Sequence, residues 1–123
     1  MFKSLVINKD DSQGYHTQVK ELNEADLQDG DVLIKVLYST INYKDALAIS
    51  GKAPVVRRFP MIPGIDLVGV VEQCDNSKFV VGQHVLLNGY GVGEKYLGGL
   101  SQKARINSEF LIPLPKSITP FNA

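Results

Sequence analysis

The sequence contains one cysteine, Cys74, two histidines and no tryptophan. A single thiol cannot build an internal disulfide framework or a zinc site that needs several cysteines. The two histidines, His16 and His84, lie far apart in the sequence, so they do not suggest a metal cluster by themselves. The scarcity of cysteine and histidine argues against a scaffold stabilised by disulfides and against a metal centre.

The sequence also has no excess of positive or negative charge and no long apolar run. Lys and Arg number 13, Asp and Glu number 13, and the formal net charge is therefore zero. Without a net basic field we expect neither nucleic acid nor an anionic membrane as a partner. No stretch approaches the roughly 18 apolar residues of a membrane span, and the short apolar start is unlike a signal peptide. We therefore expect a cytoplasmic protein.

What is present is an ordinary globular composition. The chain has 123 residues, 44% of them hydrophobic and 21% charged, which suits one domain with a core. Short β-branched runs alternate with Gly, Pro, Asn and Asp, a pattern typical of closely spaced strands. We expect strands over residues 2–7, 16–22, 32–38, 67–74, 85–87, 101–106 and 110–112. Such spacing predicts a mostly β protein, a partly open barrel or a sandwich.

Local signals add two details to this prediction. A short helix is expected over residues 43–49, with Asn42 as its N-cap, Asp45 completing a capping box, and Gly51 ending it. Gly69, inside the strand that starts near residue 67, indicates a bulge or a close approach of another segment.

Glycines are concentrated in residues 89–99. A dinucleotide fingerprint needs Gly-x-Gly-x-x-Gly between a strand and a helix. Counting from Gly89 or Gly91, the sixth residue is Glu94 or Tyr96, and a strand rather than a helix follows. We therefore interpret these glycines as allowing tight turns or the close approach of a partner. The chain has no Gly-x-Ser-x-Gly element of a serine nucleophile either.

Three positions have both a structural and a functional interpretation. Residues 42–45 are either a helix cap with solvated charges or a site in which Tyr43 and Lys44 line a helix N-terminus. Asp66 is a turn acceptor or a buried functional carboxylate. Arg57 belongs to a solvated face or to an anion clamp.

Taken together, residues 39–47, 59–71 and 82–85 resemble the catalytic domain of the medium-chain dehydrogenase/reductase superfamily. Residues 89–94 and 98–102 resemble one branch of it, the quinone oxidoreductase and acrylyl-CoA reductase family. The resemblance extends from about Phe2 to Pro115. It implies a mostly β fold, a GroES-like, partly open β-barrel with one or two short helices.

The resemblance also implies an activity. Members of this branch are zinc-free, NADPH-dependent cytosolic reductases, often homodimers, that transfer a hydride to acrylyl-CoA, enones or quinones. Zinc-binding relatives carry their ligands in the stretches that correspond to residues 39–41 and 64–66, and they have a four-cysteine lobe that this chain lacks. The resemblance therefore implies a small-molecule substrate, NADP as cofactor and no metal.

Site residues follow from the same resemblance. Tyr43 is expected to be the catalytic residue, against the nicotinamide end of the cofactor, with its phenol available to the substrate carbonyl. Asn42 is expected on the cofactor side and mainly shapes the helix start. Asp66, Gly91 and Arg57 are expected in the substrate pocket, Arg57 toward a coenzyme A phosphate.

The resemblance gives a domain expectation too. Residues 1–123 would be the substrate-side GroES-like domain, ending before a Rossmann NADP-binding domain, with residues 113–123 beginning the interdomain connection. Its own Rossmann domain would then be its partner, and the isolated chain is expected to be inactive. Two alternatives stay open: a stand-alone binding or assembly module that reuses the barrel, and a relative of the zinc alcohol dehydrogenases.

Overall fold

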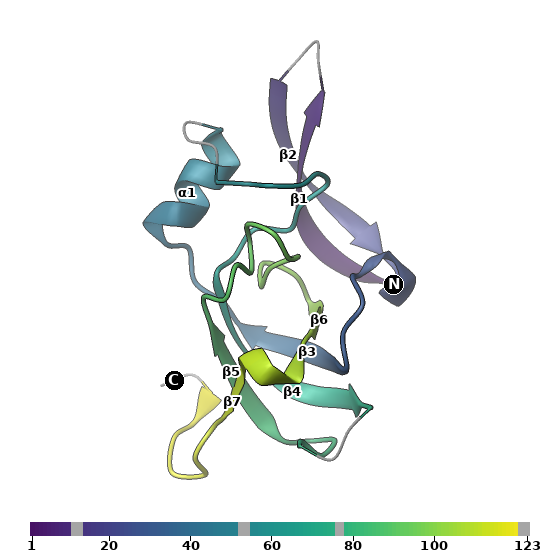
Figure 1. Cartoon of the computed structure of the whole chain (residues 1–123), viewed down its shortest axis with the longest axis vertical. Coiled ribbons are helices and arrows are strands. Elements are labelled where there is room, and N and C mark those ends of the chain that lie inside the picture. The colour runs from purple at the N-terminus through teal and green to yellow at the C-terminus, as the bar shows by residue number, and fades with distance from the viewer. Residues whose placement is uncertain (11–13, 52–54, 76–77, 121–123) are drawn as a thin grey trace.

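Two antiparallel sheets organise the chain, in a computed structural model that describes residues 1–10, 14–51, 55–75 and 78–120. A two-stranded sheet pairs β1 (Phe2–Asp10) with β2 (Gly14–Leu22). The second sheet has the order β6-β3-β4-β5-β7 (Figure 1). Its strands are β3 (Val32–Tyr38), β4 (Asp66–Cys74), β5 (His84–Asn88), β6 (Lys103–Ile106) and β7 (Leu111–Pro113).

The sheets are joined at one edge, where the N-terminal strand meets the residues just before β6. An isolated bridge pairs Ser4 with Ser101, and Leu5 N donates to Leu100 O at 2.9 Å. The two sheets do not close into one continuous ladder. The expected mostly β, partly open barrel is therefore confirmed.

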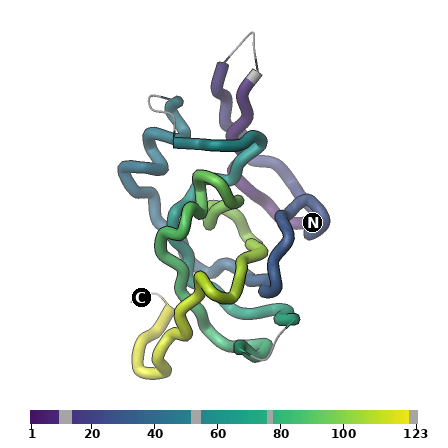
Figure 2. The backbone as a smooth tube through the Cα atoms, viewed as in Figure 1, coloured from purple at the N-terminus to yellow at the C-terminus, as the bar shows by residue number. Residues whose placement is uncertain are grey.

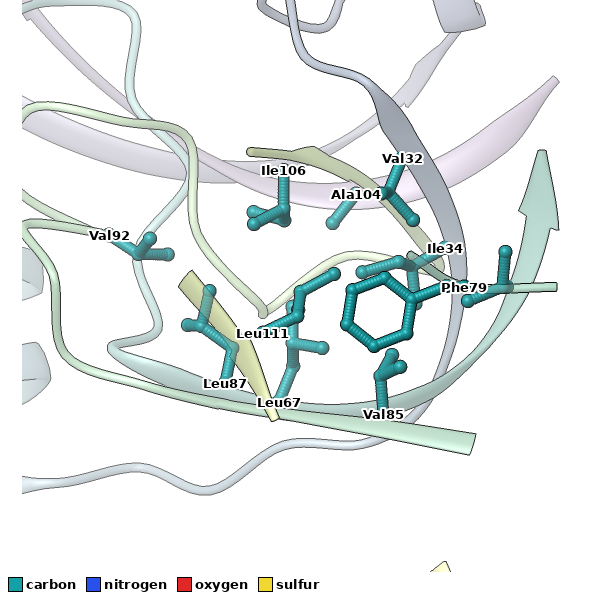
Figure 3. Packing of buried hydrophobic residues seen from close by; sticks show 11 residues of the cluster. Val32, Ile34, Leu67, Phe79, Val85, Leu87, Val92, Ala104, Ile106 and Leu111 are labelled. Atoms are coloured by element: carbon teal, nitrogen blue, oxygen red, sulfur yellow. The ribbon is translucent and has the colours of Figure 1, made fainter. Parts of the chain in front are cut away.

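The buried apolar side chains form two clusters. Figure 3 shows the cluster of the five-stranded sheet. Side chains from β3 and β6 and side chains from β4, β5 and β7 point into one space around the Phe79 ring. That cluster contains Val32, Ile34, Leu67, Val71, Phe79, Val85, Leu87, Val92, Ala104, Ile106 and Leu111. The second cluster contains Phe2, Val6, Ile7, Leu27, Leu33, Ala48, Val56, Met61, Ile62 and Leu97. It brings residues of β1 together with Leu33 of β3 and with Ala48, which lies in the helix that follows β3.

The helix α1 (Tyr43–Ser50) begins after its predicted N-cap Asn42 and ends at Gly51, as its capping residues predict. Gly51 adopts a left-handed backbone with φ of 72°, and its N–H donates to Leu47 O at 3.0 Å. Two 3₁₀ turns, η1 (Glu24–Asp26) and η2 (Ser108–Phe110), were not expected. Both are a single turn long, too short to produce an apolar period.

Gly69 in β4 allows the close approach that the sequence indicates. A Cβ at this position would overlap the Ile34 side chain and the carbonyl oxygen of Lys35, both on the neighbouring strand β3. The β3–β4 ladder also shifts register on both sides of this region. The glycine therefore lets the two strands pack tightly at the irregularity.

Candidate functional site

The first turn of α1 is held by a buried carboxylate. Asp45 is only 1% exposed. Its Oδ2 accepts a hydrogen bond from the Asn42 N–H at 2.9 Å, and its Oδ1 accepts one from the Gly64 N–H at 3.0 Å. The capping box of Asn42 and Asp45 is therefore present, and it also attaches the helix to the turn at residues 63–64.

Asp66, the first residue of β4, contacts the same helix start from the sheet side. Its Oδ2 accepts hydrogen bonds from Thr40 Oγ1 at 2.8 Å and from Asn42 Nδ2 at 3.1 Å. Its Oδ1 accepts from the Thr40 N–H at 3.2 Å, and its carbonyl oxygen accepts from Ser39 Oγ at 2.9 Å. The structure thus brings together Asn42 and Asp66, which are 24 residues apart in the sequence.

Tyr43 follows Asn42 directly and presents its side chain to solvent, 81% exposed. Its neighbour Lys44 forms an ion pair with Glu94 of the glycine-rich loop. The phenol of Tyr43 is thus accessible to a ligand, while the backbone that carries it is fixed by Asn42 and Asp45. This arrangement can present one hydrogen-bond donor to a bound molecule.

The glycine-rich loop packs backbone against backbone. Gly98 N donates to Ile62 O at 2.6 Å and Leu100 N donates to Pro63 O at 3.0 Å, so the two segments lie side by side (Figure 2). A Cβ on Gly98 would overlap the carbonyl oxygen of Gly64. These contacts support the interpretation that the glycines allow close approach.

Gly91 and Arg57 both contact the loop residue Glu94. Gly91 has a φ of 77°, and its carbonyl oxygen accepts from the N–H groups of Glu94, Lys95 and Tyr96 at 3.1, 2.8 and 3.2 Å. Arg57 is exposed, and its backbone N–H donates to Glu94 O at 2.9 Å. The two residues are therefore joined to α1 through the Glu94–Lys44 ion pair, whereas Asp66 contacts Asn42 directly. Sequence reasoning missed Glu94, because nothing in the order of residues shows that its charge meets Lys44.

A hollow of about 440 Å³ opens beside Asp66. Sequence reasoning did not single out Thr40, Ser39 and Asn88, which contribute its polar groups. Thr40 lies within residues 39–47, and the resemblance of that segment to the family was the available signal. The lining residues are Tyr38, Ser39, Thr40, Asp66, Leu67, Val68, Leu86, Asn88 and Pro120.

Within the described residues, no group of three or more His, Cys, Asp or Glu side chains is arranged to hold a metal ion. None of the helices in that part of the chain is long and apolar enough to cross a lipid bilayer.

Comparison with known proteins places this fold in a family. Residues 28–116 match the alcohol dehydrogenase GroES-like domain. The chain therefore belongs to this domain family of the medium-chain dehydrogenase/reductase superfamily. Within it, the chain is 43% identical over 119 residues to the acrylyl-CoA reductase AcuI of Ruegeria pomeroyi, an alignment that covers 96% of this chain and 36% of that protein.

Two solved structures extend the comparison. The YhdH oxidoreductase of Salmonella enterica in complex with NADP superposes with a TM-score of 0.93 at 43% identity, over 98% of this chain and 37% of that one. The YhfP protein of Bacillus subtilis with NAD bound gives 0.88 at 38% identity, over 96% and 36%. The chain thus spans little more than a third of the length of these relatives.

Proposed function

We propose that this chain is the substrate-side catalytic domain of a zinc-free, NADPH-dependent oxidoreductase that reduces activated C=C bonds or quinones by hydride transfer. The observation that carries the proposal is the accessible phenol of Tyr43 on a helix start fixed by Asp45 and Asp66. Similarity to an acrylyl-CoA reductase and to an NADP complex supports it.

The residues present fit a nicotinamide cofactor, because the exposed Tyr43 ring offers a flat surface beside polar groups. When bound, the cofactor supplies the hydride. In this proposal the Tyr43 phenol donates a hydrogen bond to the substrate carbonyl oxygen, where negative charge develops during the reduction of an enone or enoyl thioester. Asn42 fixes the turn from which Tyr43 projects, and the hollow beside Asp66 accommodates part of the bound molecules.

The relatives' length defines the rest of the proposal. Because the chain spans only 36% of the acrylyl-CoA reductase of Ruegeria pomeroyi, we assign most cofactor contacts to a Rossmann domain in a longer polypeptide. The residues after β7 would then lead into that domain. On its own, the chain would orient neither cofactor nor substrate and would be inactive.

The test compares this chain with the longest polypeptide encoded in frame with it. We expect the longer protein to oxidise NADPH in the presence of acrylyl-CoA or a quinone, and the 123-residue chain to show no turnover. Tyr43→Phe in the longer protein should lower kcat by about 100-fold, as when one donor to a developing oxyanion is removed. Tyr96→Phe, a tyrosine that packs against Phe110, serves as the control and should leave the rate unchanged.

Three results would contradict the proposal. Turnover by the isolated chain would show that no further domain is needed. A Tyr43→Phe enzyme as fast as the wild type would remove the phenol from the reaction. A protein that ends at Ala123 and binds a macromolecule instead would favour the stand-alone module.

A further inference from the structure

Asp66 connects the barrel to the helix start, although the motif resemblance suggested a place in the substrate pocket. We propose that Asp66 is a positioning residue, which orients the Asn42 side chain and thereby holds the turn that presents Tyr43. This inference rests on the proposed function, since it concerns how the same site is held in place.

The carboxylate of Asp66 is already occupied by protein donors. Three of them reach it: Thr40 Oγ1 at 2.8 Å, Asn42 Nδ2 at 3.1 Å and the Thr40 N–H at 3.2 Å. An ionised carboxylate only accepts hydrogen bonds, so all three groups must point their hydrogens at it. A group so engaged fixes its neighbours more readily than it contacts a substrate.

The Asn42 amide is the group that two carboxylates orient. Its Nδ2 lies 3.1 Å from Asp66 Oδ2 and 3.3 Å from Asp45 Oδ2. Because the amide nitrogen carries both N–H donors and the amide oxygen carries none, the nitrogen must face the two acceptors. The amide oxygen then faces the Asp45 backbone N–H, as the capping box requires. Asp66 thus helps to select one of the two amide orientations.

The two carboxylates hold the turn from different sides. Asp45 ties it to the 63–64 turn through the Gly64 N–H, whereas Asp66 ties it to β4. The Tyr43 ring is 81% exposed, so packing cannot fix its position, which depends on the backbone of residues 42–45. Loosening this backbone should misplace the phenol and lower the rate of the chemical step.

The test uses the longer protein with Asp66→Asn, Thr40→Val and the double variant. An asparagine at 66 would place its amide NH2 against at least one of the Thr40 and Asn42 donors. Thr40→Val removes one donor to Asp66 and the hydroxyl oxygen that accepts from Asn42 Nδ2 at 3.3 Å. We expect each single variant to lower kcat by 10- to 100-fold with KM changed less than about 3-fold, because placement of the phenol matters more than binding. Thr40→Ser keeps the hydroxyl and is the conservative comparison, which should recover most of the kcat lost in Thr40→Val.

Coupling and pH dependence separate positioning from direct contact. Residues that act through one network are non-additive, so the double variant should lose little more than the worse single variant. The pH–rate profile of Asp66→Asn should keep the limbs of the wild-type profile, because the carboxylate exchanges no proton with the substrate. Thr40→Val alters one side chain outside the core, so it tests the idea even if Asp66→Asn fails to fold.

The outcomes separate the two proposals. A wild-type longer protein without NADPH turnover overturns the proposed function. A wild type with turnover and variants equal to it overturns only the positioning role. Losses that multiply in the double variant, or a limb of the pH profile that disappears in Asp66→Asn, overturn positioning in favour of direct contact with the substrate.

Discussion

Two residue pairs in the chain form the same local motif with different burial. Asn42 with Asp45 and Asn23 with Asp26 are both capping boxes. Asp26 is exposed, and its Oδ2 accepts from the Asn23 N–H at 2.8 Å. Asp45 is buried and also accepts from the Gly64 N–H. The pair therefore offers an internal comparison of an exposed and a buried cap.

We predict that Asp45→Ala lowers the free energy of unfolding by about 2–4 kcal/mol, because it leaves the buried Gly64 N–H without its charged acceptor. Asp26→Ala should cost less than about 1 kcal/mol, since water replaces its lost acceptor. Urea denaturation of both variants measures the difference. Equal losses would show that burial and the Gly64 bond add nothing to the cap.

At this scale the sequence predicted what is local. Asn42, Asp45 and Gly51 marked the ends of α1 because capping depends on residues three to four apart. The bonds from Asn42 to Asp66 and from Gly64 to Asp45 depend on how distant segments pack. No local pattern contains that information, so the contacts of Asp66 could not be predicted from the sequence.

Between elements, Lys103 of β6 connects η1 to β4. Its Nζ lies 3.1 Å from Glu24 Oε2 and 3.3 Å from Glu72 Oε2. The hydrogen bond to Glu24 raises the pKa of Lys103 above its usual value of 10.5; partial burial opposes this shift, and Glu72 reinforces it. The ammonium form of Lys103 is thus favoured in the folded state. The two ion pairs connect η1 and the central strand β4 to the edge strand β6.

We predict that Lys103→Gln lowers the free energy of unfolding by about 0.5–1 kcal/mol near neutral pH, a small value because all three side chains are partly exposed. A raised folded-state pKa means that the stabilisation is complete below the unfolded-state pKa and is lost as pH rises through the folded-state pKa. The deficit of the variant should therefore be present at pH 7 and 9 and shrink as the pH rises beyond the usual lysine pKa of 10.5. Denaturation at these pH values measures it.

Lys35 provides the control for that prediction. It lies opposite Lys103 on β3, is exposed, and forms no ion pair with any residue that the structure describes. Lys35→Gln removes the same charge and should leave the stability unchanged within about 0.5 kcal/mol at every pH. A pH dependence of the same size in both variants would refute the role assigned to Glu24 and Glu72.

The sequence predicted the strands better than their order. Residues 32–38 matched β3 because a β-branched run was bounded by a clear turn, whereas β7 begins at Leu111, one residue later than expected, after η2. The order β6-β3-β4-β5-β7 places the late strand β6 beside β3. This pairing joins segments that are far apart in the sequence, and strand patterns alone do not specify such partners.

For the whole molecule, one exposed apolar face stands out. Four exposed apolar side chains line a single shallow hollow that runs from the β1–β2 sheet to the end of β3. They are Val19, Leu37, Tyr38 and Ile41, with exposed fractions of 66%, 37%, 48% and 68%. The chain also has no net charge and a pI of about 6.7. An apolar patch on an uncharged molecule favours association.

We therefore predict that the 123-residue chain self-associates most strongly near pH 6.7. The Ile41→Lys variant should raise the apparent dissociation constant of this self-association by about 10-fold. Sedimentation velocity over a concentration series measures it.

The added charge alone would also reduce association, so Val80→Lys is the control. Val80 is 66% exposed and lies outside the hollow, and its variant has the same net charge. If both variants weaken association equally, net charge governs it. A larger effect of Ile41→Lys means that the face defined by Val19, Leu37, Tyr38 and Ile41 is the contact surface.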